Sequence, residues 1–213
     1  EFYHPDLTSH MNPMMDQWEK LNLHFDAIYS GFLANAAQTA LVRDAIRRFA
    51  KDGQLVVVDP AMADDGKLYV VFDQTMVEEM RKLVAEATLI TPNYTEACLL
   101  TGTTWLDRTP TEREIQDLCQ KLLDLGPKQV IITSVPGKPD EIQVVSQSAG
   151  EVGYHSYVVK RIPFGTCGTG DVFTSVVTGC ILKGKSLEES AKIAADFLEV
   201  VIQSTLDSGK DPR

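Results

Sequence analysis

The stretch Gly165-Thr166-Cys167-Gly168-Thr169-Gly170-Asp171-Val172-Phe173 joins a glycine-rich turn to an apolar helix. Its glycines let the backbone adopt positive φ angles, and the first N–H groups of the following helix remain free to face an anion. Asp171 stands at the junction, where an ionised carboxylate can accept the proton of a hydroxyl that attacks a phosphoryl group. Judged by these residues alone, an ordinary helix start with an acidic first turn is an equally good interpretation.

Periodicity predicts helices and strands in alternation along the chain. Apolar side chains with helical spacing follow the turn, at Val172, Phe173, Val176, Val177, Cys180 and Ile181, and predict a helix over Thr169–Leu182. Further helices are expected at Asn35–Lys51, Asp73–Ala87, Tyr94–Thr101, Thr111–Leu125 and Leu187–Ser204. Short apolar runs predict strands at Ala27–Tyr29, Gln54–Val58, Leu89–Ile90, Gln129–Thr133, Ile142–Ser146 and His155–Arg161.

This alternation indicates an α/β fold with a mostly parallel central sheet covered by helices. The last two strands are expected to form an antiparallel hairpin within that sheet. Gly53 is expected to close the first helix, and Ser186 with Glu189 forms a capping box for the last. No repeat or linker interrupts the chain, so residues 1–213 are expected to form a single domain.

A second glycine-containing segment, Gly179-Cys180-Ile181-Leu182-Lys183-Gly184-Lys185-Ser186, matches the pattern of a P-loop. A P-loop requires a strand before its first glycine and a bare loop across its variable positions. Here the preceding residues have helical spacing, and Cys180, Ile181 and Leu182 continue the same apolar face. We therefore expect Gly184 to end one helix and Ser186 to begin the next.

Polar residues follow three of the expected strands, and a proline lies beside each of these groups. They are Asp59 after Val56–Val58, Asn93 and Glu96 after Leu89–Ile90, and Thr133 and Ser134 after Val130–Ile132. The carboxyl ends of parallel strands meet at one edge of a sheet, so we expect these residues to lie near Asp171. Carboxylates there suit hydrated magnesium, and hydroxyls suit phosphate or ribose oxygens. The alternatives are a turn residue for Asp59 and an N-cap with a capping box for Asn93 and Glu96.

Composition limits the classes of partner. The chain has 213 residues and a formal net charge of -10, which argues against nucleic acid or an anionic membrane as the main partner. Its four cysteines show no C-x-x-C spacing, which is typical of reduced thiols in a cytoplasmic protein. Its four histidines include no i, i+4 pair, so the sequence does not predict a zinc site.

Taken together, the motifs resemble those of the pyridoxal kinases, vitamin B6 kinases of the ribokinase-like superfamily. The matching blocks are Ser30-Gly31-Phe32-Leu33, Asp59-Pro60-Ala61-Met62, Thr91-Pro92-Asn93 with Glu96, Leu100-Thr101-Gly102 and Gly168-Thr169-Gly170-Asp171. They occur in the family's order and approximate spacing over nearly the whole chain. The resemblance implies a three-layer α/β/α domain of the ribokinase-like kind.

The resemblance also implies an activity, the transfer of the γ-phosphoryl group of ATP to the 5′-hydroxymethyl group of pyridoxal, pyridoxamine or pyridoxine. Asp171 would act as the base, and the N–H groups of Gly168, Thr169 and Gly170 would stabilise the transferring group. Asp59 and Glu96 would manage magnesium and phosphate. The ATP side would be lined by Thr91, Asn93, Thr133, Ser134, Phe164, Gly165, Thr166 and Cys167. The implied cofactors are ATP and Mg²⁺, and the requirement for a monovalent cation stays open. The implied assembly is a homodimer.

The sequence departs from the family's pattern at three single residues and in its N-terminal part. Ala34, Ala61 and Ala63 stand where other residues, two of them glycines, are usual. Family members also carry an additional N-terminal section that contributes the first strand and much of the vitamin pocket. We expect this chain to lack that section and the extreme C-terminus, and vitamin binding by these residues alone to be badly impaired.

Two other functions remain open. A hydroxymethylpyrimidine (phosphate) kinase of the same superfamily shares the strand-end motifs and the Gly-Thr-Gly-Asp turn. A catalytically silent nucleotide- or vitamin-binding homologue would share the fold. The second alternative has no need of a base, so the presence of Asp171 favours an enzyme.

Overall fold

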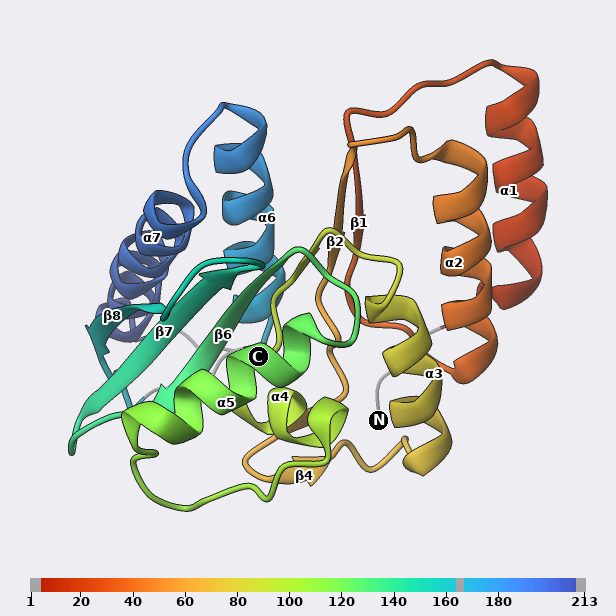
Figure 1. Ribbon diagram of the computed structural model, residues 1–213. Coiled ribbons are helices and arrows are strands. Elements are labelled where there is room, and N and C mark those ends of the chain that lie inside the picture. The colour runs from red at the N-terminus through yellow and green to blue at the C-terminus, as the bar shows by residue number, and fades with distance from the viewer. Residues whose placement is uncertain (1–4, 164–166, 210–213) are drawn as a thin grey trace.

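The computed structural model describes residues 5–163 and 167–209, and its centre is a six-stranded sheet (Figure 1). The strand order is β1-β2-β5-β6-β7-β8. These strands are β1 (Ala27–Ser30), β2 (Leu55–Val58), β5 (Leu89–Ile90), β6 (Gln129–Pro136), β7 (Glu141–Ser148) and β8 (His155–Lys160). The first four run parallel, and β7 and β8 continue the sheet antiparallel. The predicted mostly parallel sheet with an antiparallel hairpin is thus confirmed.

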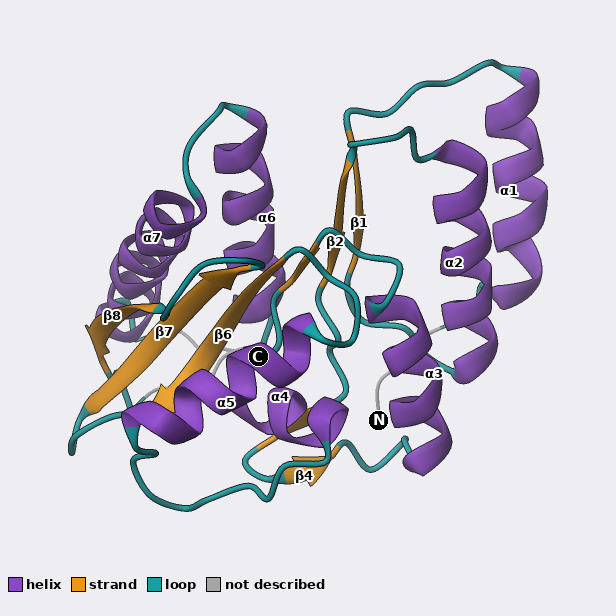
Figure 2. Cartoon of the chain, in the orientation of Figure 1, coloured by secondary structure: helices purple, strands orange, loops and turns teal. Residues whose placement is uncertain are grey.

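Helices cover both faces of this sheet, which gives the three layers seen in Figure 2. One face carries α2 (Ala36–Phe49), α3 (Gln74–Val84), α4 (Tyr94–Thr101) and α5 (Glu112–Leu123). The other face carries α6 (Thr169–Leu182) and α7 (Leu187–Asp207). The predicted α/β/α architecture is therefore confirmed, with every predicted helix present.

The strand side chains divide between two apolar cores. Val56 and Val58 belong to the core beneath α2 to α5, whereas Val57 between them belongs to the core beneath α6 and α7. In β6, Ile132 belongs to the core beneath α2 to α5, and Ile131 belongs to the core beneath α6 and α7. Successive side chains of a strand point to opposite faces, so a continuously apolar strand is the pattern required for a sheet buried on both sides.

Two elements were not predicted. Helix α1 (Thr8–Lys20) contains Pro13, a residue that usually interrupts a helix, and Met15 is its one buried residue. It is held against α2 by Arg48, whose guanidinium bonds Asp16 and Glu19 at 2.7 and 2.9 Å. The second element is a short hairpin of β3 (Ala63–Asp64) and β4 (Lys67–Leu68).

Several predicted helix ends can be compared with the structure. The capping box of Ser186 and Glu189 at α7 is confirmed. The position of Gly53 was predicted wrongly, because α2 ends at Phe49 and Gly53 instead turns the chain into β2 with φ 78°. The P-loop alternative is excluded because α6 continues through Leu182, which leaves no bare loop after Gly179.

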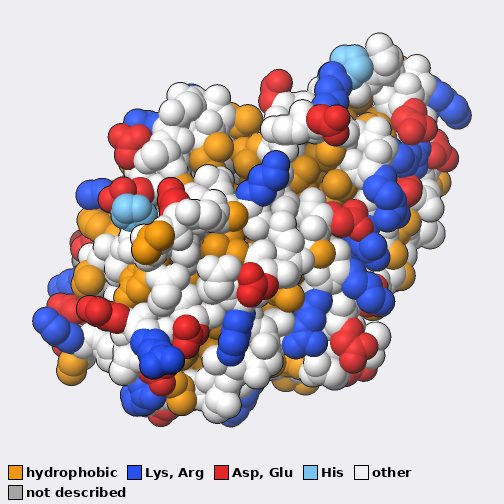
Figure 3. Space-filling model, viewed as in Figure 1, with side chains coloured by type: hydrophobic (Ala, Val, Ile, Leu, Met, Phe, Trp, Pro, Cys, Tyr) orange, Lys and Arg blue, Asp and Glu red, His pale blue; other side chains and the backbone are white. Residues whose placement is uncertain are grey.

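The surface mixes acidic and basic side chains over the face drawn in Figure 3. Within the described residues, no helix is both long and apolar enough to cross a membrane.

Candidate functional site

The predicted site residues gather where the parallel strands end. The N–H of Asp59 donates to Ser30 O at the end of β1, and the N–H of Thr91 donates to Val58 O at the end of β2. The N–H of Thr133 donates to Pro92 O, which extends the same parallel pairing by one more strand. These bonds set the three strand-end motifs side by side along one edge of the sheet, as the sequence predicted.

Asp171 reaches this edge from the first turn of α6. The N-cap residue is Gly168, whose φ of 84° lies in the left-handed region that favours glycine. The exposed carboxylate of Asp171 accepts a hydrogen bond at 3.1 Å from the Tyr29 hydroxyl on β1. A Cβ at Gly31 would lie 2.9 Å from Asp171 Oδ1, so Gly31 leaves the space that the carboxylate occupies.

Asp59 lies under the same helix start and is only 6% exposed. Its Oδ2 is so close to Gly170 that a Cβ there would lie 3.3 Å away. Burial, together with the negative charge of Asp171, raises the pKa of Asp59 to about 7. Among the residues that the structure describes, no Lys or Arg forms an ion pair with either carboxylate.

This electrostatic setting suits a divalent cation, which would supply the missing positive charge beside Asp59. The described residues contain no group of three or more His, Cys, Asp or Glu side chains able to hold a metal. Proteins usually hold magnesium with one or two carboxylates, completed by phosphate oxygens and water.

Glu96 and Asn93 form a capping box at the start of α4, the alternative that the sequence had left open. The carboxylate of Glu96 also accepts the N–H groups of Met62 and Ala63, at 3.0 and 3.4 Å. Asn93 donates from Nδ2 to Ala63 O at 2.7 Å. Both side chains thus fix the loop that follows Asp59, and burial raises the pKa of Glu96 to about 8 although these backbone N–H groups lower it.

The hydroxyl residues differ in what they offer to a ligand. Thr91 is buried, and its hydroxyl lies 2.8 Å from that of Thr174 on α6, so it joins the sheet to the helix. Thr133 is partly exposed, and Ser134 is exposed at φ 56° where the β6–β7 register shifts. Of these three hydroxyls, Ser134 is the most accessible to a ligand.

The remaining predicted residues belong to the turn before α6. Cys167 and Gly168 are exposed, and Thr169 and Gly170 form the first helical positions. The predictions for Phe164, Gly165 and Thr166 lie outside the described residues. No sequence motif indicated Tyr29 or Thr174, whose hydroxyls meet the site through tertiary contacts. The sequence contains one hint of Tyr29, which is an aromatic residue directly before the Ser30-Gly31 motif.

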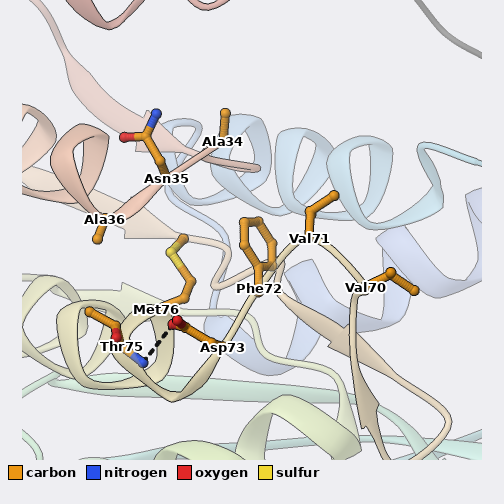
Figure 4. A pocket seen from close by; sticks show the side chains of 9 residues that line it. All are labelled: Ala34, Asn35, Ala36, Val70, Val71, Phe72, Asp73, Thr75 and Met76. Carbon is orange, nitrogen blue, oxygen red and sulfur yellow. Dashed lines mark hydrogen bonds between the residues drawn. The ribbon is translucent and has the colours of Figure 1, made fainter.

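A separate hollow of about 420 Å³ has none of these groups in its lining (Figure 4). It is lined by Ala34, Asn35, Ala36, Val70, Val71, Phe72, Asp73, Thr75 and Met76. Its one acidic side chain, Asp73, accepts the N–H of Thr75 at 2.9 Å as the N-cap of α3. The hollow contains none of the predicted site residues, so the sheet edge remains the better candidate for chemistry.

Comparison with known proteins relates this geometry to vitamin kinases. The sequence profile described as phosphomethylpyrimidine kinase matches residues 14–212. Pyridoxal kinase of Arabidopsis thaliana is 29% identical over 202 residues, which are 89% of this chain and 63% of that protein. The hydroxymethylpyrimidine/phosphomethylpyrimidine kinase of Bacillus subtilis is 26% identical over 193 residues, which are 88% of this chain and 67% of that protein.

A solved structure gives a closer likeness. A Bacteroides thetaiotaomicron protein with the provisional name phosphomethylpyrimidine kinase, crystallised with pyridoxal, is 37% identical with a TM-score of 0.92. The match covers 99% of this chain and 73% of that one. The chain thus spans about 63% of the curated Arabidopsis relative and somewhat more of the solved structure. By its profile match over nearly all of its length, the chain belongs to the pyridoxal kinase and phosphomethylpyrimidine kinase family of ribokinase-like proteins.

Proposed function

We propose that this chain is the greater part of a vitamin B6 kinase, which phosphorylates the 5′-hydroxymethyl group of pyridoxal, pyridoxine or pyridoxamine with ATP. The observation that carries the proposal is the pairing of Asp171, at the N-terminus of α6, with the buried Asp59 at the carboxyl edge of the sheet. A base, a helix N-terminus and a place for a cation meet there, which are the parts that phosphoryl transfer to a hydroxyl requires.

In the proposed reaction, Asp171 takes the proton of the substrate hydroxyl as that oxygen forms a bond to the γ-phosphorus of ATP. The bond between the γ-phosphorus and its bridging oxygen breaks, and ADP leaves with that oxygen. The N–H groups of Gly168, Thr169 and Gly170 face the transferring group and stabilise its charge. Magnesium, when bound, would neutralise phosphate charge beside Asp59.

The other predicted residues act around this centre. Glu96 influences magnesium and phosphate through the loop that it holds after Asp59. We assign the ATP side to Thr91, Asn93, Thr133, Ser134, Phe164, Gly165, Thr166 and Cys167. A single domain over residues 1–213, a homodimer and a monovalent-cation site also remain part of this proposal.

The second candidate is a kinase of hydroxymethylpyrimidine or its phosphate. The family profile and the Bacillus subtilis relative, which carry those names, favour it. Pyridoxal in the crystals of the Bacteroides protein favours the vitamin B6 kinase, because that protein is the more similar in sequence. Both substrates present a hydroxymethyl group to the same base, so the chemistry at Asp171 is common to the two candidates.

A substrate comparison tests the proposal. The protein is incubated with Mg²⁺ and ATP and with pyridoxal, pyridoxine or hydroxymethylpyrimidine, and phosphorylated products are separated by chromatography. We expect phosphorylation of the vitamin B6 compounds, and a loss of about 10²–10⁴-fold in Asp171→Asn with ATP affinity retained. Asp117→Asn, an exposed carboxylate on α5, is the matched control and should leave turnover unchanged. Phosphorylation of the pyrimidine alone would assign the second candidate, and unaltered turnover in Asp171→Asn would refute the proposed base.

A further inference from the structure

The hydrogen bond between Tyr29 and Asp171 joins two elements that are far apart in the sequence. Tyr29 lies on β1, Asp171 lies on α6, and their side chains meet at 3.1 Å across a separation of 142 residues. Among the residues that the structure describes, Tyr29 is the one side chain that donates a hydrogen bond to this carboxylate. The contact is independent of the capping interactions that begin α6, because its N-cap is Gly168.

The phenol ring of Tyr29 is held by packing. Tyr29 packs against the core beneath α6 and α7, which includes Val57 of the neighbouring strand and Phe173 and Val177 of α6. A ring carried by a strand and fixed by such neighbours places its hydroxyl at a defined point, as a loop residue would not. Among the described residues the side chain of Asp171 is exposed, and a carboxylate there without the hydrogen bond would sample several rotamers.

The chemistry of the phenol fixes the direction of this hydrogen bond. Burial raises the pKa of Tyr29, and the charges of Asp59 and Asp171 raise it further. The hydroxyl therefore stays protonated and donates to Asp171, which excludes Tyr29 itself as the base. Gly31 permits the arrangement, because a Cβ there would lie 2.9 Å from Asp171 Oδ1 and 3.1 Å from the Tyr29 hydroxyl.

We propose that Tyr29 is a positioning residue that holds the Asp171 carboxylate in one orientation through Oδ1, so that Oδ2 is presented to the substrate hydroxyl. This inference rests on the proposed function of Asp171 as the base. One oxygen is engaged by the phenol, and the other takes the proton from the attacking oxygen. A base held within a narrow range of orientations raises the rate of the chemical step without changing the affinity for ATP.

The test removes the hydroxyl and keeps the ring. In Tyr29→Phe we expect kcat to fall on the order of 10-fold while KM for ATP stays within about two-fold. Tyr157→Phe is the matched control, because the Tyr157 hydroxyl also donates to a carboxylate, Asp196 on α7, at 2.6 Å. We expect the control variant to retain kcat. An unchanged kcat in Tyr29→Phe would overturn the inference.

A double variant separates this inference from the proposed function. If Tyr29 acts through Asp171, Tyr29→Phe has no further effect on the residual turnover of Asp171→Asn. An additional loss in the double variant means that Tyr29 acts elsewhere, and it overturns the inference while the base assignment stands. Full turnover in Asp171→Asn overturns the base assignment and the inference together.

Crystal structures of the protein and of Tyr29→Phe give a readout that does not depend on turnover. We expect the Asp171 carboxylate to have a single orientation with Tyr29 present and to turn or split between rotamers without the hydroxyl. A carboxylate that keeps the same single orientation in Tyr29→Phe contradicts the inference.

Discussion

Asp59 and Glu96 are both acidic, both buried and both close to a strand end, yet their surroundings give them different parts in the site. Glu96 is 2% exposed and accepts three backbone N–H groups, those of Met62, Ala63 and Asn93. Asp59 is nearly as buried but faces a second carboxylate instead of a set of donors. Glu96 is therefore a structural anchor for the loop, and Asp59 is the group that gains most from a cation.

Replacing Glu96 by Gln tests this anchor. The variant keeps the side-chain shape, but its NH₂ group would face a backbone N–H donor, so we expect a loss of about 1–3 kcal/mol in the free energy of unfolding. Urea denaturation at about pH 9, above the pKa of about 8 at which the buried Glu96 ionises, provides the measurement. Glu189→Gln is the control, because Glu189 completes an equivalent but exposed capping box at α7 and should lose less. Equal losses in the two variants would contradict a special role for the buried anchor.

Helix α6 has two glycine-containing ends, and only its beginning has the contacts of a functional site. Gly170 and Asp171 at that beginning adjoin Asp59 and Tyr29. A Cβ at Gly179, near the other end, would meet no atom within 4 Å outside the helix's own nearby backbone. Gly179 is thus an ordinary helical position, although the sequence around it matches a phosphate-binding pattern.

Gly179→Ala is expected to stabilise the protein by about 0.5–1 kcal/mol, because alanine loses less backbone entropy than glycine in a helix. Thermal unfolding gives the stability, and the phosphorylation assay gives the activity, which should not change. A severe loss of turnover in this variant would mean that the excluded P-loop binds phosphate after all.

The start of helix α5 carries a pH-dependent contribution to stability. Hydrogen bonds from Arg108, at 2.7 and 2.9 Å, and from the Thr111 backbone hold the pKa of Glu114 down at about 2. A carboxyl group whose pKa is lowered on folding stabilises the protein above its unfolded pKa, and this contribution is lost as the pH falls through the folded value.

The free energy of unfolding of the unaltered protein should therefore exceed that of Glu114→Gln at neutral pH. We expect this difference to persist down to about pH 5 and to shrink as the pH approaches 2. Urea titrations across that range measure it. Glu112→Gln, which changes a carboxyl of the same helical turn, provides the comparison. A difference for Glu114 that does not vary with pH would exclude the ion pair as its source.

At the scale of the whole molecule, the sheet separates two cores of buried apolar side chains. Ile131 and Ile132 are adjacent in β6 and fully buried, one in each core. We expect Ile131→Val and Ile132→Val each to lower the free energy of unfolding by about 0.5–1.5 kcal/mol, since each removes one buried methylene. Denaturant unfolding measures both variants, and a negligible effect in either would show that its face of the sheet is not packed.

The arrangement of layers was predictable because it depends on patterns that are local in the sequence. Continuous apolar strands require a sheet covered on both faces, and amphipathic segments between them supply the cover. Helix α1 escaped prediction because Pro13 lies inside it and Met15 is its one buried residue, and it is held in place by Arg48 of another helix. The β3–β4 hairpin is too short to show a pattern of its own.

By itself, the sequence determined the α/β fold, the edge of the sheet at which the site lies, and the candidates Asp59 and Asp171. These follow from periodicity and from the rule that parallel strands end at one edge. Only the tertiary structure decided that Tyr29 hydrogen-bonds Asp171, that Gly31 makes room for this bond and that Glu96 binds the loop after Asp59. Such contacts join residues from separate elements, and their distances depend on how helices and strands pack, which no local pattern records.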